Sequence, residues 1–99
     1  MIRHVVMWEL NDAAQAQAFC GVMSECRSLV AGMRGFELAT RCADLPASVD
    51  VCLIATFDDA HALRAYQNHP VHLAVSQRLA PMRRQRHVLD FEVNTGAAP

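Results

Sequence analysis

The chain has 99 residues, of which 53% are hydrophobic, and a formal net charge of −1 from 9 basic and 10 acidic side chains. This length suits one domain, and so apolar a composition excludes an intrinsically disordered chain. The nearly balanced charge argues against nucleic acid or an anionic membrane surface as a partner. No apolar run is long enough to span a membrane, and Glu9 interrupts the N-terminal stretch too early for a secretory signal. We therefore expect a cytoplasmic protein.

Residue usage also limits the chemistry. Every basic residue is arginine, which excludes Schiff-base catalysis by lysine. The cysteines, Cys20, Cys26, Cys42 and Cys52, form no Cys-x-x-Cys pair, and a spacing of six residues would point Cys20 and Cys26 to different sides of a helix. We expect reduced, buried thiols that act as small apolar residues.

Two segments are apolar on both of their alternating faces. Residues 3–10 and 49–57 show this pattern, which predicts strands that are covered on both sides. Residues 36–42 alternate with a single apolar face, which predicts a half-buried strand. The polar, proline-containing residues 44–48 suit the loop of a hairpin between this strand and the next.

A long helix is predicted between the first two strands. Asn11 or Asp12 can cap it, and apolar residues then recur in steps of three and four from Ala16 to Met33. This spacing predicts an amphipathic helix of about 20 residues. Gly32, followed by a second glycine at position 35, marks its end.

The second helical region begins after Asp58 and Asp59 and is interrupted by a proline. Proline removes the preceding residue from the helical conformation, so we expect a second, shorter helix that starts at Pro70 and stops before Pro81. Residues 86–93 alternate as a last strand, and residues 94–99 form a flexible C-terminal tail.

The predicted order β-α-β-β-α-β is that of an α+β, ferredoxin-like subunit with its first and third strands at the centre of an antiparallel sheet. These are the two strands that are apolar on both faces. Helices cover one face of such a sheet, so the other face needs a cover from outside the chain. We predict a homodimer in which two sheets pack face to face.

The segment Tyr66-Gln-Asn-His69-Pro-Val-His72 contains the best candidates for chemistry. His72 falls in the first turn of the helix after the proline, where the helix dipole lowers the pKa of an imidazole and keeps it able to accept a proton. Tyr66 can donate a hydrogen bond to a developing oxyanion. The structural alternative is that His69 caps the helix and Tyr66 is an ordinary core residue. The proline break and the lack of a nearby carboxylate argue against a metal site at His69 and His72.

His4 and Asp90 are polar residues within apolar strands that the fold places side by side. They can face one cavity, or His4 can be a hydrogen-bonded core residue and Asp90 an edge residue. His61 and His87 have charged or polar neighbours and are expected to be solvated.

Several apolar side chains should lie between the sheet and the helices. A plain hydrophobic core is their default interpretation, and a ligand pocket is the alternative. The residues are Val6, Trp8, Phe19, Met23, Leu53 and Phe57.

His4-Val-Val, Tyr66-x-x-His69-Pro-x-His72 and Leu89-Asp90-Phe91 resemble the stress-responsive dimeric α/β-barrel (Dabb) family across residues 2–93. The resemblance implies a ferredoxin-like subunit that dimerises into a barrel, with residues 1–93 as the domain. One plant member is a polyketide cyclase that performs an aldol condensation without a cofactor. By similarity, its catalytic tyrosine and histidine correspond to Tyr66 and His72, and further catalytic positions correspond to His4 and Asp90.

One position departs from the resemblance. A cavity histidine of the plant enzyme corresponds to Val51, so the cavity here should be more apolar and the substrate different. The expected substrate-contacting residues are Val6, Trp8, Phe19, Met23, Val51, Leu53 and His69.

The leading hypothesis is a homodimer with a small-molecule cavity that catalyses cyclisation or isomerisation of a carbonyl compound with no metal or cofactor. The first alternative is a non-catalytic module that binds a small ligand or serves a stress response. The second is a cofactor-free monooxygenase or haem-handling enzyme, which rests on fold analogy alone.

Overall fold

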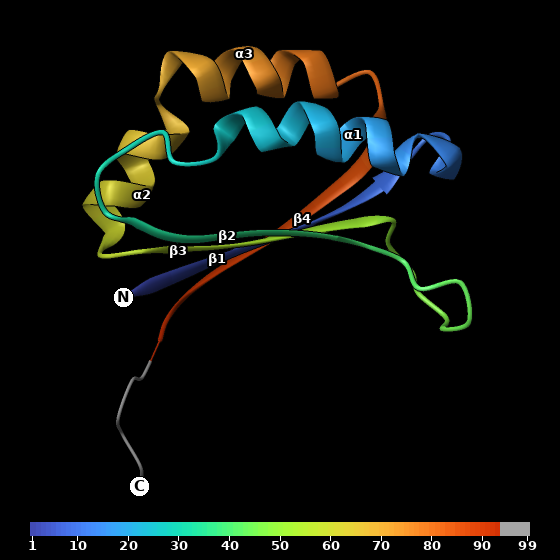
Figure 1. The fold of residues 1–99 in the computed structure, drawn as a ribbon, viewed down its shortest axis with the longest axis horizontal. Coiled ribbons are helices and arrows are strands. Elements are labelled where there is room, and N and C mark those ends of the chain that lie inside the picture. The colour runs from blue at the N-terminus through green and yellow to red at the C-terminus, as the bar shows by residue number, and fades with distance from the viewer. Residues whose placement is uncertain (94–99) are drawn as a thin grey trace, which may run out of the picture.

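The computed structural model describes residues 1–93, and the predicted tail 94–99 lies outside them. Within this range the chain forms four strands and five helical segments, and Figure 1 shows how they are arranged. In chain order they are β1 (Ile2–Leu10), η1 (Ala13–Gln15), α1 (Ala16–Met23), η2 (Ser24–Cys26), β2 (Met33–Thr40), β3 (Val51–Phe57), α2 (Ala60–Gln67), α3 (Pro70–Leu79) and β4 (Arg83–Glu92). The segments η1 and η2 are single 3-10 turns.

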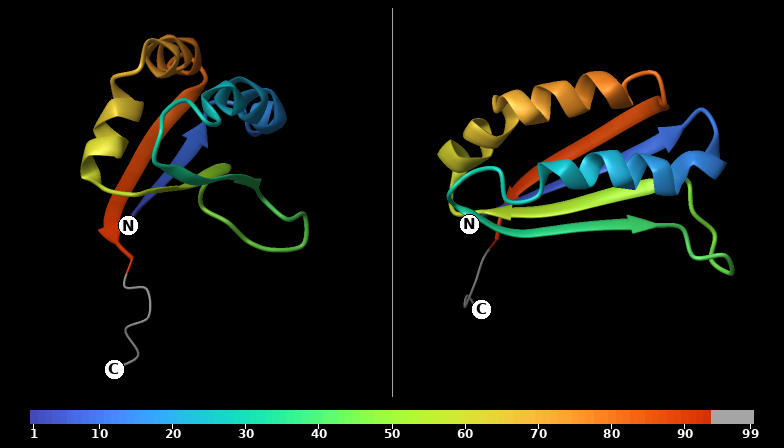
Figure 2. Two further views of the ribbon diagram at one scale, coloured as in Figure 1. Left: turned by 60° about the vertical axis from the view of Figure 1, so that its left-hand side comes forward. Right: turned by 45° about the horizontal axis from the view of Figure 1, so that its top comes forward.

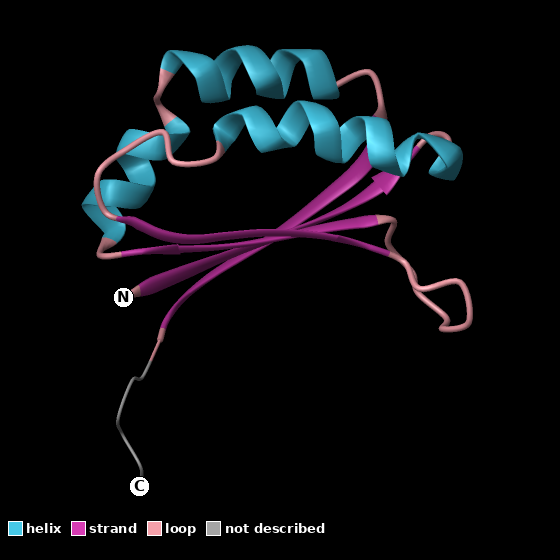
Figure 3. Cartoon of the chain, in the orientation of Figure 1, coloured by secondary structure: helices cyan, strands magenta, loops and turns pink. Residues whose placement is uncertain are grey.

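The strands form one antiparallel sheet in the order β2-β3-β1-β4. All three α-helices lie on the same face of this sheet, as the two turned views in Figure 2 show. The predicted ferredoxin-like fold is therefore confirmed, including the central position of the two strands that are apolar on both faces. Figure 3 shows the resulting two layers, helices over strands.

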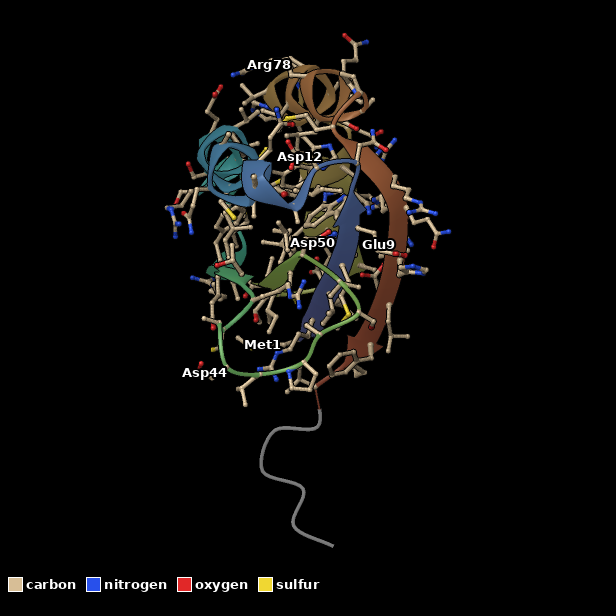
Figure 4. All side chains as sticks on the ribbon, turned by 90° about the vertical axis from the view of Figure 1, so that its right-hand side faces the viewer. Met1, Glu9, Asp12, Asp44, Asp50 and Arg78 are labelled. Carbon is tan, nitrogen blue, oxygen red and sulfur yellow. The ribbon has the colours of Figure 1, made fainter. Side chains whose placement is uncertain are left out.

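The hydrophobic core fills the space between the layers. Every second residue of β3 is buried, from Val51 to Phe57, because successive side chains of a strand point to opposite faces. Trp8 packs against Phe19 of α1 with ring centroids 5.0 Å apart. Arg78 lies on the outer side of α3 (Figure 4) and donates a hydrogen bond to Glu25 of η2, with a nitrogen–oxygen distance of 2.8 Å. This pair ties the last helix to the end of the first helical region.

The first helical region is shorter than predicted. Asp12 caps it as expected, since its carboxylate accepts a hydrogen bond from the amide of Ala14. The α-helix ends at Met23, however, and helical structure ends altogether at Cys26. Beyond it the chain turns with a positive φ of 60° at Ser28 and 91° at Gly32, conformations that no α-helix contains.

The predicted helix of about 20 residues was therefore wrong in its second half. Val30 and Met33 keep the apolar spacing of the helix because both pack against the same core, although neither is helical. The second glycine of the predicted stop signal, Gly35, instead lies within β2, where the pairing register with β3 shifts.

The strand boundaries also differ in detail from the predictions. The second strand runs from Met33 to Thr40 rather than over 36–42, and Cys42 is exposed, contrary to the expectation of a buried thiol. The third begins at Val51 instead of residue 49. The last begins three residues earlier than predicted, at Arg83, because the chain reverses tightly after α3 through a hydrogen bond from the amide of Met82 to the carbonyl of Leu79.

The region after β3 has the predicted break at Pro70. Asp59 caps α2 by accepting a hydrogen bond from the amide of Ala62. His69 leaves the helical conformation and Pro70 opens α3 as its first residue, because the preceding residue is forced out of the α region while proline suits the first turn. The two helices thereby meet at a bend, with Tyr66 on one side of it and His72 on the other.

The face of the sheet opposite the helices is covered by no element of residues 1–93. It is nevertheless apolar in its middle. Met7 is 39% exposed there, and Leu89 and Phe91 of β4 are 63% and 39% exposed. None of the helices described is long and apolar enough to cross a membrane.

Candidate functional site

A cavity of about 240 Å³ lies between the inner face of the sheet and the helices. One part of its lining is apolar and comes from β1, β3, α1 and α3: Val6, Trp8, Met23, Leu53, Val75 and Leu79. The other part is polar and comes from β1, α2, α3 and β4: His4, Tyr66, His72, Ser76, Arg83 and Arg86. The mixture of an apolar wall with a few convergent polar groups is typical of small-molecule sites.

Tyr66 lies at the end of α2 with its side chain completely buried. Its hydroxyl oxygen has no hydrogen-bond partner among residues 1–93. Burial raises the pKa of this phenol well above its ordinary value, and the neighbouring Cys26 thiol raises it further. The hydroxyl therefore stays protonated and can donate a hydrogen bond at any physiological pH.

His72 packs against Tyr66 across the bend between α2 and α3, with ring centroids 4.7 Å apart. Its Nδ1 is buried and has no hydrogen-bond partner within the described residues. The pKa of His72 is lowered from 6.5, chiefly by burial and further by the neighbouring His4, Arg86 and His69 side chains, while the Gln67 backbone opposes this shift. The predicted direction holds, but burial, and not the start of the helix, is the main cause.

His4 is the one buried polar residue among the described residues, at 2% exposure. Its Nδ1 is hydrogen-bonded to the Asp90 carboxylate on the neighbouring strand, because β1 and β4 pair these two residues directly. A carboxylate can only accept, so Nδ1 carries the hydrogen and Nε2 is the free acceptor. The His4 ring lies 6.3 Å from the ring of Tyr66, centroid to centroid.

The structure thus brings His4, Tyr66 and His72 to one cavity, with Asp90 behind His4. Other expected contact residues lie elsewhere. His69 caps α3, since its Nδ1 accepts a hydrogen bond from the amide of Val71 at 3.1 Å, and it is outside the cavity lining.

Phe19 and Val51 are also outside the lining. Phe19 is buried behind Trp8, and Val51 stands opposite Trp8 in the pairing of β1 with β3, where both belong to the core. Val6, Trp8, Met23 and Leu53 do line the cavity, whereas Phe57 is a core residue. His61 and His87 are exposed, as predicted.

Three residues of the lining were not predicted from the sequence: the cationic Arg83 and Arg86 of β4, and Ser76 of α3. Alternation back from Asp90 would place Arg86 on the inner face of the last strand, so a signal for it existed. Arg83 has the opposite parity, and nothing in the spacing indicates that it shares this face. Residues 1–93 contain no group of three or more His, Cys, Asp or Glu side chains placed to hold a metal ion.

Fold and site together define a ferredoxin-like α+β protein with a small cavity beneath its helices. Residues 2–93 match the stress responsive A/B barrel domain, Dabb, and the chain belongs to this family. An uncharacterised protein of Streptomyces coelicolor is 35% identical in an alignment of 80 residues that covers 75% of this chain and 81% of the relative.

Solved structures share the fold at lower identity. A dimeric ferredoxin-like protein from Thermobifida fusca has a TM-score of 0.82 at 24% identity, covering 93% of this chain and 90% of that one. A Dabb family protein from Mesorhizobium loti has a TM-score of 0.77 at 24% identity, covering 93% and 95%. A hydroxynitrile lyase from Passiflora edulis has the same fold at 15% identity, with a TM-score of 0.76 and coverage of 95% and 94%.

Proposed function

We propose that this protein binds a small carbonyl compound in the cavity and promotes proton transfer on it, leading to cyclisation or isomerisation without a metal or redox cofactor. The observation that carries the proposal is a pair of buried polar atoms, the Tyr66 hydroxyl and His72 Nδ1, which lie beside one cavity without a hydrogen-bond partner in residues 1–93. Leaving such a group unsatisfied costs about 1–3 kcal/mol. A ligand that satisfies both atoms would recover that energy on binding.

The proposed chemistry assigns one task to each group. Neutral His72 accepts a proton from the carbon next to a carbonyl, and the electron pair of the broken C–H bond moves into an enolate. Tyr66 donates a hydrogen bond to the enolate oxygen and keeps its own proton, because its raised pKa makes phenolate formation unfavourable. In an isomerisation, protonated His72 then returns the proton to a different carbon of a conjugated enolate. In a cyclisation, the enolate carbon attacks a second carbonyl, and the alkoxide so formed receives the proton from His72.

His4 approaches the same space from β1. Its free Nε2 can accept a hydrogen bond from a bound hydroxyl, and Asp90 fixes the tautomer that leaves this atom free. Asp90 is thus a positioning residue in this scheme, and His4 is a substrate-contacting one.

The proposal includes a homodimer built on the bare face of the sheet. Met7, Leu89 and Phe91 are apolar and exposed on that face, and a second copy that packs there would remove them from water. The ferredoxin-like protein from Thermobifida fusca, which shares this fold, is dimeric, and this supports a homodimer.

Exchange of carbon-bound hydrogen tests the proposal directly. The protein is incubated with acetophenone in D₂O, and deuterium uptake at the methyl group is followed by NMR. We expect protein-dependent exchange that Tyr66→Phe and His72→Ala each reduce by about a hundredfold, within the range for loss of a general base or an oxyanion donor. The matched control is His61→Ala, which removes an exposed histidine of α2 that is not part of the cavity lining.

Two results would count against the proposal. Exchange that survives both substitutions in folded protein would show that Tyr66 and His72 are not the acid–base pair. Binding of carbonyl compounds without any exchange would favour the alternative, a non-catalytic ligand-binding module.

A further inference from the structure

Two arginines of β4 line the cavity, and neither has a role in the chemistry proposed above. Arg86 stands opposite Trp8 and Arg83 opposite Leu10 in the pairing of β4 with β1. Trp8 and Leu10 both point into the core, so their partners on β4 share the inner face of the sheet. Both arginines therefore line the same cavity, next to its apolar wall.

An irregularity of the strand makes this possible. Residues three apart on a regular strand point to opposite faces, so Arg83 and Arg86 should diverge. The pairing shifts between Glu9 and Leu10, which oppose Gln85 and Arg83, so Arg84 is an extra residue of β4. Such a bulge changes the alternation of side chains across it, and here it places Arg83, the residue before the bulge, on the face that Arg86 occupies.

Neither arginine has a carboxylate partner among residues 1–93. Other arginines do have one, for example Arg34 with Asp58 and Arg78 with Glu25. The acidic residue nearest to Arg86 on the inner face, Asp90, is hydrogen-bonded to His4.

The charge of Arg86 is disfavoured where it lies. Partial burial lowers the pKa of Arg86 and the nearby Arg83 lowers it further, while Asp90 and Tyr66 oppose this shift. An arginine pair that stays charged beside an apolar cavity is thus a preformed site for an anion, since a guanidinium presents a planar fork of donors that matches a carboxylate.

We propose that the ligand of this cavity is a small organic acid, with an apolar ring or chain against Trp8 and a carboxylate held by Arg83 and Arg86. This inference names the substrate class and rests on the proposed function only in placing the ligand in the cavity. The volume agrees with it: an apolar cavity of about 150 Å³ binds benzene, so one of about 240 Å³ holds a ring that carries a carboxylate.

The direction of the ligand follows from the lining. With its carboxylate at β4, the body of the ligand extends toward Tyr66 and His72 on the helical side of the cavity. A keto acid bound in this way would present its carbonyl group, rather than its carboxylate, to the Tyr66 hydroxyl. The arginines would then select the acid while the tyrosine and histidine act on it.

Binding can be measured without any turnover, because Trp8 is the one tryptophan of the chain and lines the cavity. Its fluorescence is titrated with benzoate and with benzamide, which has the same shape and no charge. We expect benzoate to bind at least about tenfold more tightly than benzamide, and Arg83→Gln and Arg86→Gln each to weaken benzoate by about tenfold with no effect on benzamide. The matched control is Arg84→Gln, which removes the same charge from the bulge residue, outside the lining.

The outcomes separate this inference from the proposed function. Equal affinity for benzoate and benzamide, no binding of either, or benzoate affinity unchanged in both Arg83→Gln and Arg86→Gln would overturn the anion site. Acetophenone carries no carboxylate, so its binding does not need the arginines, and its exchange in D₂O in the parent protein tests Tyr66 and His72. Absence of that exchange in the parent protein, together with intact benzoate binding, would contradict the proposed chemistry and leave the anion site standing.

Discussion

His4 and Asp90 are 86 residues apart in the sequence, yet their side chains are hydrogen-bonded across the two neighbouring strands β1 and β4. His4 is 2% exposed and Asp90 is 38% exposed. The pair therefore links the cavity lining to the accessible edge of the sheet, and it leaves only one ring nitrogen of His4 free for a ligand.

Removing the Asp90 carboxylate should destabilise the protein. Asp90→Ala leaves a buried N–H of His4 without an acceptor, which costs about 1–3 kcal/mol of unfolding free energy. Asp90→Asn should lose less unfolding free energy, because its amide oxygen can still accept a hydrogen bond from His4. Denaturant unfolding measures both, and Glu92→Ala, an exposed carboxylate on the same strand, is the control. Equal losses in the Ala and Asn variants would contradict this account.

Tyr66→Phe should separate stability from activity. The hydroxyl is buried without a partner in the described residues, so removing it should raise the unfolding free energy of the ligand-free protein by about 1 kcal/mol, while the proposed exchange activity falls. Denaturant unfolding and the D₂O assay on one preparation test both parts. A loss of stability greater than about 1 kcal/mol would mean that the hydroxyl is hydrogen-bonded in solution.

His72 should make the protein less stable in mild acid. Its folded pKa lies below its ordinary 6.5, so the unfolded chain takes up the proton first as the pH falls. The stability linked to His72 is present above about pH 6.5 and is lost as the pH falls through the folded pKa. His72→Gln should therefore flatten the fall of unfolding free energy between about pH 7 and 5.

The matched control for this prediction is His61→Gln, which alters an exposed histidine. NMR titration of the His72 ring supplies a second measurement. His4, His69 and Arg86 all oppose its protonation, so an Arg86→Gln background should move the pKa upward. A His72 pKa at or above 6.5 in the parent protein would remove the basis for its role as a neutral base.

Much of the fold could be predicted because the strands follow the two-residue period of side chains about a sheet. The apolar pattern of residues 3–10 and 49–57 indicated central strands, and Pro70 indicated the bend that places Tyr66 near His72. The end of the first helix could not be predicted, because Val30 and Met33 keep a helical spacing while packing on the core from a turn and a strand.

The site could be predicted only where regular geometry holds. His4 and Asp90 follow from the pairing of the first and last strands, and Tyr66 and His72 from the proline break. Arg83 could not be predicted, because its place in the lining depends on the bulge at Arg84. No turn-forming residue at this position indicates a bulge. The spacing of His69 also suggested a substrate contact, but its side chain caps α3 instead.

The bare sheet face yields the last prediction, on assembly. Leu89 is 63% exposed on that face of β4, and a charge buried at an interface without a partner is strongly unfavourable. Leu89→Glu should therefore convert the proposed homodimer into a monomer in sedimentation experiments. Leu45→Glu is the matched control, since Leu45 is 62% exposed but lies in the loop between β2 and β3. A parent protein that sediments as a monomer at all concentrations, or a Leu89→Glu variant that remains dimeric, would exclude this face as the interface.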